Sequence, residues 1–221
     1  MERADFYKQQ IQDLESQIKK LQQRKSYFGW LRFSSIAAII AVFYFLYSLG
    51  IWYVIIVSVL LLIIFTRLLL ADLKNKATIA QTAHLININK DELKFLAGEY
   101  YSFPEGNQYI PDEHLYANDL DIFGKASLFQ YTNRTTSEMG SSRLAAYLKD
   151  PADANIILQR QISVKELSAD TQWRQYLQAL GREKQILFTT KQRLEDWVQE
   201  KPVFHQFATW NGLGLQLQFF Y

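Results

Sequence analysis

Residues 28–70 read FGWLRFSSIAAIIAVFYFLYSLGIWYVIIVSVLLLIIFTRLLL, and their only charged side chains are Arg32 and Arg67. Gly50 divides the stretch into two apolar runs, each close to the roughly 20 residues that a helix needs to cross the hydrocarbon core of a bilayer. The pattern therefore predicts a transmembrane helical hairpin. The alternative is a buried hairpin of a soluble bundle, which the rest of so short a chain would hardly cover.

The charges that flank the hairpin indicate its orientation. The turn at Ser48, Leu49 and Gly50 carries no charge, whereas cations lie on the other side of both runs. These cations are Lys19, Lys20, Arg24, Lys25, Arg32, Arg67, Lys74 and Lys76. By the positive-inside rule, both termini are expected in the cytoplasm. Arg32 and Arg67 can extend their guanidinium groups to the lipid headgroups, so they need no functional explanation.

Residues 1–27 form an amphipathic segment with apolar side chains at alternating spacings of three and four. The repeating positions are Ala4, Tyr7, Ile11, Leu14, Ile18 and Leu21. This is the a/d pattern of a coiled coil and favours a homodimer. A single amphipathic helix, lying on the rest of the chain or on the headgroups, remains the alternative.

Two segments connect the hairpin to the C-terminal part of the chain. In residues 71–98 the apolar side chains thin out, which predicts a juxtamembrane helix that ends at Gly98. Asn89 or Asp91 could instead cap a new helix within it. Residues 99–118 combine aromatic side chains with Pro104, Gly106 and Pro111, which indicates an irregular linker or short hairpin.

Residues 119–205 are predicted to form a helical domain. Ser137, Asp153 and Asp170 are candidate N-caps of helices that end at Lys149, near Ser168 and at Gly181. A further helix is expected from about Arg182 to Glu200, before Pro202. Residues 206–221 become increasingly apolar and could open a third transmembrane segment. The fold class is thus mainly α.

Bulk composition excludes little. The formal net charge is +2, and a nucleic-acid footprint needs Lys and Arg clustered on one face. The chain contains no cysteine, so it has neither disulfides nor thiolate metal ligands, which is consistent with a reducing compartment.

Within the helical domain, residues 119–167 read DLDIFGKASLFQYTNRTTSEMGSSRLAAYLKDPADANIILQRQISVKEL. The order of residues resembles the core domain of the MutS family of DNA mismatch repair proteins. The matching positions that we take as candidate structural sites are Ser127, Leu128, Phe129, Asn133, Arg134, Thr135, Met139, Gly140, Arg160 and Glu166. Together with the hairpin, the chain looks like the N-terminal part of a membrane-associated bacterial MutS-related protein. The resemblance implies the bacterial inner (plasma) membrane as its location.

The resemblance also implies where the chemistry lies. MutS proteins are dimeric ABC-type ATPases, and their core transmits ATP-driven rearrangement to a clamp that binds mismatched DNA. Such an ATPase needs a Gly-x-x-x-x-Gly-Lys-Ser/Thr loop, and the fragment Gly124-Lys125-Ala126-Ser127 lacks both the earlier glycine and the correct position of the hydroxyl. ATP and Mg²⁺ are therefore implied for a full-length relative, and no cofactor is expected in this chain.

No other motif predicts catalysis or metal binding. Phe103-Pro104-Glu105 matches a mismatch-reading Phe-x-Glu element in letters only, within a linker. The three histidines, His84, His114 and His205, are too far apart in sequence to suggest a metal site. Asn133, Arg134 and Thr135 are expected to bond backbone groups and fix the angle between two helices.

Arg160 is expected to pair with Glu166 or a backbone carbonyl, with a DNA phosphate contact as the less favoured role. Two functions follow from the sequence. In the first, the chain is the membrane anchor and lever region of a MutS-like ATPase; DNA is a possible partner, and the DNA-binding residues are unknown. In the second, the chain is a membrane-anchored helical scaffold unrelated to DNA. A stand-alone enzyme is a distant third.

Overall fold

The protein, described here by a computed structural model, is mainly α-helical, as its sequence predicts. The structure describes residues 3–46, 50–185 and 187–200, and no strand occurs among them. The expected third transmembrane segment at residues 206–221, together with Pro202 and His205, lies outside the described residues.

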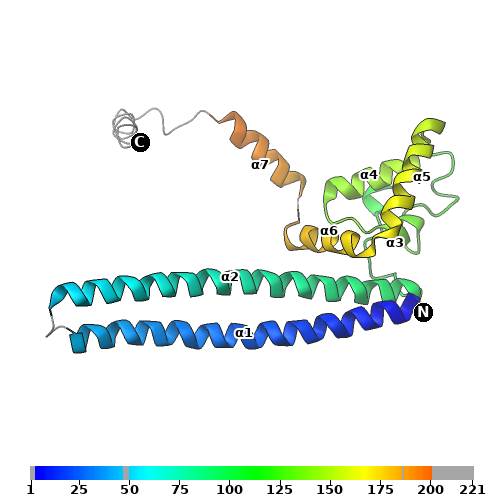
Figure 1. The fold of residues 1–221 in the computed structure, drawn as a ribbon. Helices are drawn as coiled ribbons and strands as arrows, with labels where there is room; N and C mark the ends of the chain where they lie inside the picture. The colour runs from blue at the N-terminus through cyan, green and yellow to red at the C-terminus, as the bar shows by residue number, and fades with distance from the viewer. Residues whose placement is uncertain (1–2, 47–49, 186, 201–221) are drawn as a thin grey trace.

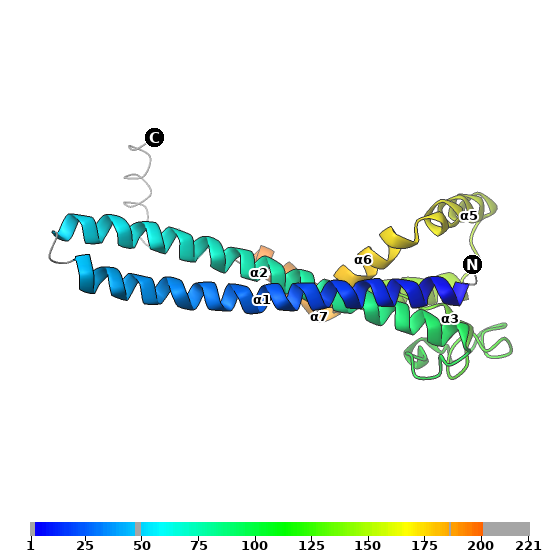
Figure 2. The same ribbon diagram turned by 60° about the horizontal axis from the view of Figure 1, so that its bottom comes forward.

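Two long antiparallel helices dominate the fold. Helix α1 spans Arg3–Leu46 and helix α2 spans Ile51–Leu96, and they lie side by side along their length in both views (Figure 1, Figure 2). The N-terminal segment and the first apolar run are therefore one helix. The second run continues into the juxtamembrane segment without a break, so neither Asn89 nor Asp91 begins a new helix.

The a/d pattern of α1 has a partner within the chain. Ile11, Leu14 and Leu21 are half-buried, while the residues that directly flank Leu14 and Leu21 are exposed. On the same side, Asn75 of α2 donates a hydrogen bond of 3.0 Å to the carbonyl of Leu21. The seam thus packs against α2, and the coiled-coil pattern is satisfied without a second copy of the chain. The homodimer stays a prediction.

In the apolar half of the hairpin the large side chains point outward. Trp30 is 69% exposed, Trp52 is 74% exposed, and Ile36, Ile40 and Ile51 between them are also exposed. A core helix of a soluble protein would bury such side chains. Both helices are long and apolar enough to span a membrane.

The helices after the linker are short. They are α3 (Leu128–Thr132), α4 (Glu138–Lys149), α5 (Ala154–Ala169), α6 (Thr171–Glu183) and α7 (Phe188–Gln199). Ser127, Ser137 and Asp170 cap α3, α4 and α6 by accepting a hydrogen bond from a backbone N–H of the first turn.

Three details of the expected helices are wrong. Asp153 occupies the N-cap position of α5 but makes no capping hydrogen bond with its side chain. Gly181 lies inside α6, which continues to Glu183, because this glycine serves a close contact rather than a helix end. Helix α7 begins at Phe188, six residues after the expected start, and the backbone N–H of Phe188 donates to the Glu138 carboxylate at 2.6 Å.

The linker, which contains the 3₁₀ turn η2 (Asn107–Tyr109), is held by one buried glutamine. Gln130 is fully buried; its amide donates to the carbonyls of Tyr101 (3.2 Å) and Phe103 (2.6 Å) and accepts from the N–H of Ala126 (2.8 Å). Because a buried amide without partners is costly, these bonds fix the linker against α3. Next to it, the ring of Phe129 is buried directly beneath Gly106.

Gly106 provides a test of this packing. Its φ of +74° is left-handed, and a Cβ there would lie 2.5 Å from the Phe129 ring. We expect Gly106→Ala to lower the free energy of unfolding by about 2–5 kcal/mol, since a left-handed residue costs about 1–2 kcal/mol and overpacking about 1–3 kcal/mol. Thermal unfolding in detergent micelles, followed by circular dichroism, measures the loss.

Gly98→Ala is the matched control, because Gly98 has a φ of +77° and nothing within 4 Å of the added Cβ. Gly98→Ala should lower the free energy of unfolding only by the cost of a left-handed backbone, about 1–2 kcal/mol. Equal losses in the two variants would mean that the contact with Phe129 does not constrain the linker.

Candidate functional site

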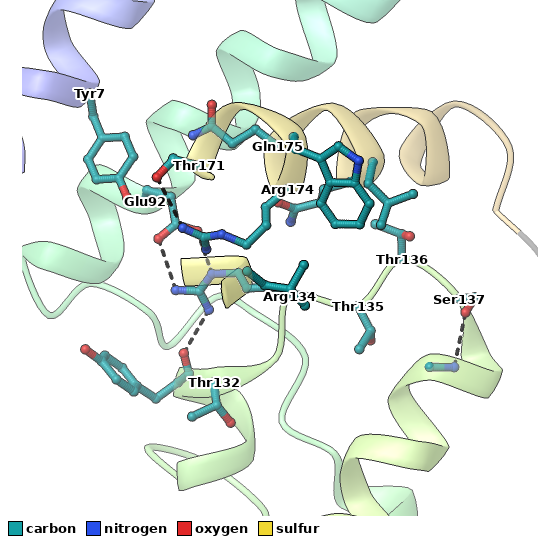
Figure 3. A pocket seen from close by; sticks show the side chains of 16 residues that line it. Tyr7, Glu92, Thr132, Arg134, Thr135, Thr136, Ser137, Thr171, Arg174 and Gln175 are labelled. Atoms are coloured by element: carbon teal, nitrogen blue, oxygen red, sulfur yellow. Dashed lines mark hydrogen bonds and ion pairs between the residues drawn. The ribbon is translucent and has the colours of Figure 1, made fainter. Parts of the chain in front are cut away.

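A concave site lies where the hairpin meets the helical domain. It is an open pocket of about 680 Å³ between α1, α2, the turn from α3 to α4, and α6. Figure 3 shows that the side chains of Tyr7, Glu92, Arg134 and Arg174 converge in it from these four parts of the chain. We call this region the joint.

Arg134 is the central cation of the joint. Its guanidinium donates two hydrogen bonds to the Glu92 carboxylate, at 2.6 and 3.3 Å, and a third to the carbonyl of Tyr131 at 2.8 Å. The guanidinium carbon lies 3.3 Å from the centroid of the Phe95 ring. Bidentate pairing and stacking on an aromatic face both use the planarity of arginine. The guanidinium of Arg134 therefore connects the α3–α4 turn to α2, and Glu92 neutralises its charge.

The neighbouring residues shape the turn itself. The side-chain oxygen of Asn133 accepts from the backbone N–H of Thr135 at 2.9 Å and from its hydroxyl at 2.7 Å. The Thr135 hydroxyl also lies 2.6 Å from that of Ser141 in α4. Asn133 and Arg134 thus bond backbone groups, as the sequence led us to expect, whereas the Thr135 side chain bonds the side chains of Asn133 and Ser141. That these residues fix the angle between two helices stays a prediction.

Polar pairs also hold α6 on α2. Asn89 is fully buried, and its amide exchanges hydrogen bonds with that of Gln175 at 3.3 and 3.0 Å. Arg182 donates to the Asp91 carboxylate at 2.8 Å. At the same end of α6, Gly181 lies so close to Thr136 that any Cβ would overlap the threonine side chain. These contacts fix both the position and the direction of α6.

The remaining groups of the pocket are hydrogen-bonding rather than reactive. Arg174 donates to the Thr171 hydroxyl at 3.2 Å and to the Ser168 carbonyl at 3.4 Å. Burial raises the pKa of Tyr7 above its usual value, and the Glu92 carboxylate adds to the effect, so this phenol is neutral near pH 7. In the described parts of the chain, no three His, Asp or Glu side chains are grouped to hold a metal ion.

Other candidate residues have structural partners. Arg160 does not pair with Glu166 in the described structure; its guanidinium carbon lies 3.8 Å from the centroid of the Tyr147 ring, and Glu166 is exposed. Leu128 and Met139 are exposed, whereas Ser127 and Phe129 are buried. At Gly140 an added Cβ would approach the hydroxyl of the Ser137 cap to 3.1 Å.

The segments Phe103-Pro104-Glu105 and Gly124-Lys125-Ala126-Ser127, which partly match functional motifs, make structural contacts. Phe103 packs on Phe95 with ring centroids 4.4 Å apart, and the Glu105 carboxylate accepts from the Asn107 amide at 2.8 Å. The N–H of Gly124 donates to the carbonyl of Glu105 at 2.9 Å. Both segments therefore build the linker.

His114 is likewise engaged in local hydrogen bonds. One ring nitrogen accepts from the backbone N–H groups of Tyr116 and Ala117, and the other lies 3.2 Å from the carbonyl of Lys149. The imidazole thus connects the linker to the end of α4.

Sequence reasoning missed most of the joint. Tyr7, Glu92, Arg174 and Gln175 come from three helices and share no motif. Asn89 offered a signal, because it follows Thr82 and Ile86 at the spacing of one side of a helix, and a polar residue at a buried position needs a partner.

Comparison of the chain with models of known protein families, with curated proteins and with solved structures found no match.

Arg134→Lys tests whether the joint depends on arginine geometry rather than on charge. Lysine keeps the attraction to Glu92 but loses the second hydrogen bond and the stacking on Phe95. We expect the variant to lose about 1–3 kcal/mol of stability, measured by thermal unfolding in detergent micelles.

Lys191→Ala is the comparison. Lys191 pairs with Glu195 at 3.6 Å on the exposed surface of α7. Removing this pair should change stability by less than about 0.5 kcal/mol. If Arg134→Lys is no more harmful than Lys191→Ala, a lysine suffices at the joint and the arginine geometry is not required.

Proposed function

We propose that the chain is the membrane anchor and lever region of a MutS-like DNA repair ATPase. In this proposal the apolar half of the hairpin crosses the bacterial inner membrane, with both termini in the cytoplasm. The helical domain then receives or transmits movement. Catalysis belongs to an ATPase domain outside these residues, where ATP and Mg²⁺ would bind.

The observation that carries this proposal is the continuity of α2. A single helix runs from the apolar residues after Gly50 to Leu96, and α6 docks on its last third through Asn89 and Asp91. Because no hinge separates the two parts of α2, a displacement of one end moves the other. A helical domain on a flexible tether would not be coupled in this way.

The resemblance to MutS proteins supports the functional part of the proposal. Asn133, Arg134 and Thr135, which belong to the resemblance, lie at the joint. The joint is where the helical domain is attached to α2. We propose dimerisation of the whole protein and contact with DNA or a partner protein as the events to which this movement is coupled.

A second candidate is a membrane-anchored scaffold unrelated to DNA. The apolar side chains that α5 and α7 leave exposed favour it, among them Ile162, Val164, Trp197 and Val198. Exposed apolar surface of this kind is typical of protein–protein contacts.

Spin labels can test whether the joint couples the domain to the hairpin. The chain contains no cysteine, so Asn87→Cys on α2 and Lys165→Cys on α5 can be labelled selectively. We expect one narrow distance distribution by double electron–electron resonance. Adding Gln175→Leu, which leaves the buried side-chain oxygen of Asn89 without its donor at a cost of about 1–3 kcal/mol, should broaden it.

Lys191→Ala, on the exposed surface of α7, serves as the control and should leave the distribution unchanged. A broad distribution in the parent protein would argue against a lever.

Binding to duplex DNA distinguishes the two candidates. If the chain contributes to a DNA-binding assembly, the full chain in nanodiscs should bind duplex DNA with an affinity that falls steeply as salt increases, because phosphate contacts release counterions. A lack of binding at low salt would favour the scaffold. Phosphatidylcholine nanodiscs avoid competition from anionic lipid.

A further inference from the structure

The positive charge of the chain is concentrated at one level of the hairpin. Residues 19–32 and 67–76 contain eight Lys or Arg side chains and one acidic residue, Asp72. The rest of the chain has 16 Lys or Arg against 21 Asp or Glu, so it is net negative. We call the following side chains the cationic collar: Lys19, Lys20, Arg24, Lys25, Arg32, Arg67, Lys74 and Lys76.

The fold brings the two halves of the collar together. Asn75 of α2 donates to the carbonyl of Leu21 at 3.0 Å, and Arg32 of α1 lies 3.1 Å from the Asp72 carboxylate. Because the helices are antiparallel and adjacent, these contacts place residues 19–32 beside residues 67–76 (Figure 2).

The acidic residue at this level is removed from the surface. Asp72 is fully buried, and one of its oxygens lies 3.1 Å from Arg32 and 3.3 Å from Lys76. These are ion pairs without the alignment of hydrogen bonds, and both carboxylate oxygens lack a hydrogen-bond donor in the structure. The buried Asp72 carboxylate thus offsets part of the positive charge of Arg32 and Lys76, and it is not accessible to solvent.

The other six cations of the collar are exposed and form no ion pair with any described residue. Elsewhere several cations are paired, for example Lys90 with Glu15, Arg134 with Glu92 and Arg182 with Asp91. In the collar, six exposed cations close together in the fold are therefore left for an external anion.

The collar directly adjoins the apolar surface. Residues 33–46 and 51–66 contain no charged side chain, and Tyr27 and Trp30 are exposed at the level of the collar. Amphipathic aromatic rings and cations at one level are typical of the boundary between acyl chains and headgroups. We propose that the cationic collar binds the headgroups of anionic phospholipids, an inference that rests on the proposed membrane insertion of the hairpin.

Nucleic acid shares the phosphate chemistry but fits the surroundings less well. A duplex against the collar would leave the adjoining apolar side chains, such as Phe33 and Leu70, in water. A phospholipid satisfies both parts, since its phosphate meets the cations while its acyl chains cover the apolar side chains.

Native mass spectrometry of the full chain, released from bilayers of equal parts phosphatidylcholine and phosphatidylglycerol, tests the proposal. We expect phosphatidylglycerol to be retained in preference to phosphatidylcholine. The combined variant Lys19→Gln, Lys20→Gln, Arg24→Gln and Lys25→Gln should lower this preference at least about tenfold, because each cation near an anionic surface contributes severalfold to binding. Glutamine has a helix propensity close to that of lysine and arginine, so α1 should remain folded.

The matched control removes four exposed cations outside the collar, by Lys165→Gln, Lys184→Gln, Lys191→Gln and Arg193→Gln. It changes the net charge equally and should keep the lipid preference. Equal preferences in the two variants, or no preference in the parent protein, would overturn the collar as a lipid site.

Extraction of phosphatidylcholine vesicles with alkaline carbonate distinguishes failure of the inference from failure of the proposed function. A chain that stays in the vesicles without preferring phosphatidylglycerol refutes only the collar. A chain that is extracted refutes membrane insertion and the collar together. If the collar variant loses duplex DNA binding but keeps its lipid preference, the collar is a nucleic-acid surface instead.

Discussion

The burial of polar side chains along one side of α2 is the constraint on which the rest of the structure depends. Asp72, Asn75, Thr82 and Asn89 are all buried there, and a buried polar group needs a partner. Asn75 finds the carbonyl of Leu21, which fixes the register of α1, and Asn89 finds Gln175, which fixes α6. Apolar contacts alone would allow the helices to slide. These few polar contacts select one arrangement.

The sequence predicted those features that depend on neighbouring residues. Ser137 and Asp170 each cap a helix as predicted, because capping requires only a side-chain oxygen and N–H groups two or three residues later. The apolar runs on either side of Gly50 predicted two long helices, since composition and length suffice for that inference.

Features that depend on distant parts of the chain were less predictable. Glycine is typical of a helix end, yet Gly181 lies inside α6. A glycine is needed there because Thr136 occupies the space beside it. Arg160 was expected to pair with Glu166 or a backbone carbonyl, but its guanidinium lies over the ring of Tyr147 on another helix. The joint was missed because its residues come from four parts of the chain, and only the packing of α6 on α2 brings them together.

The length of α2 has a mechanical consequence. Its 46 residues correspond to about 69 Å at a rise of about 1.5 Å per residue, and about 39 Å of this follows Leu70. Transmembrane helices adjust their tilt to the thickness of the surrounding bilayer. With the apolar half in a bilayer, a change in tilt of about 10° would swing the Leu96 end by roughly 7 Å, and the docked helices would move with it. Bilayer thickness would then set the position of the helical domain above the membrane surface.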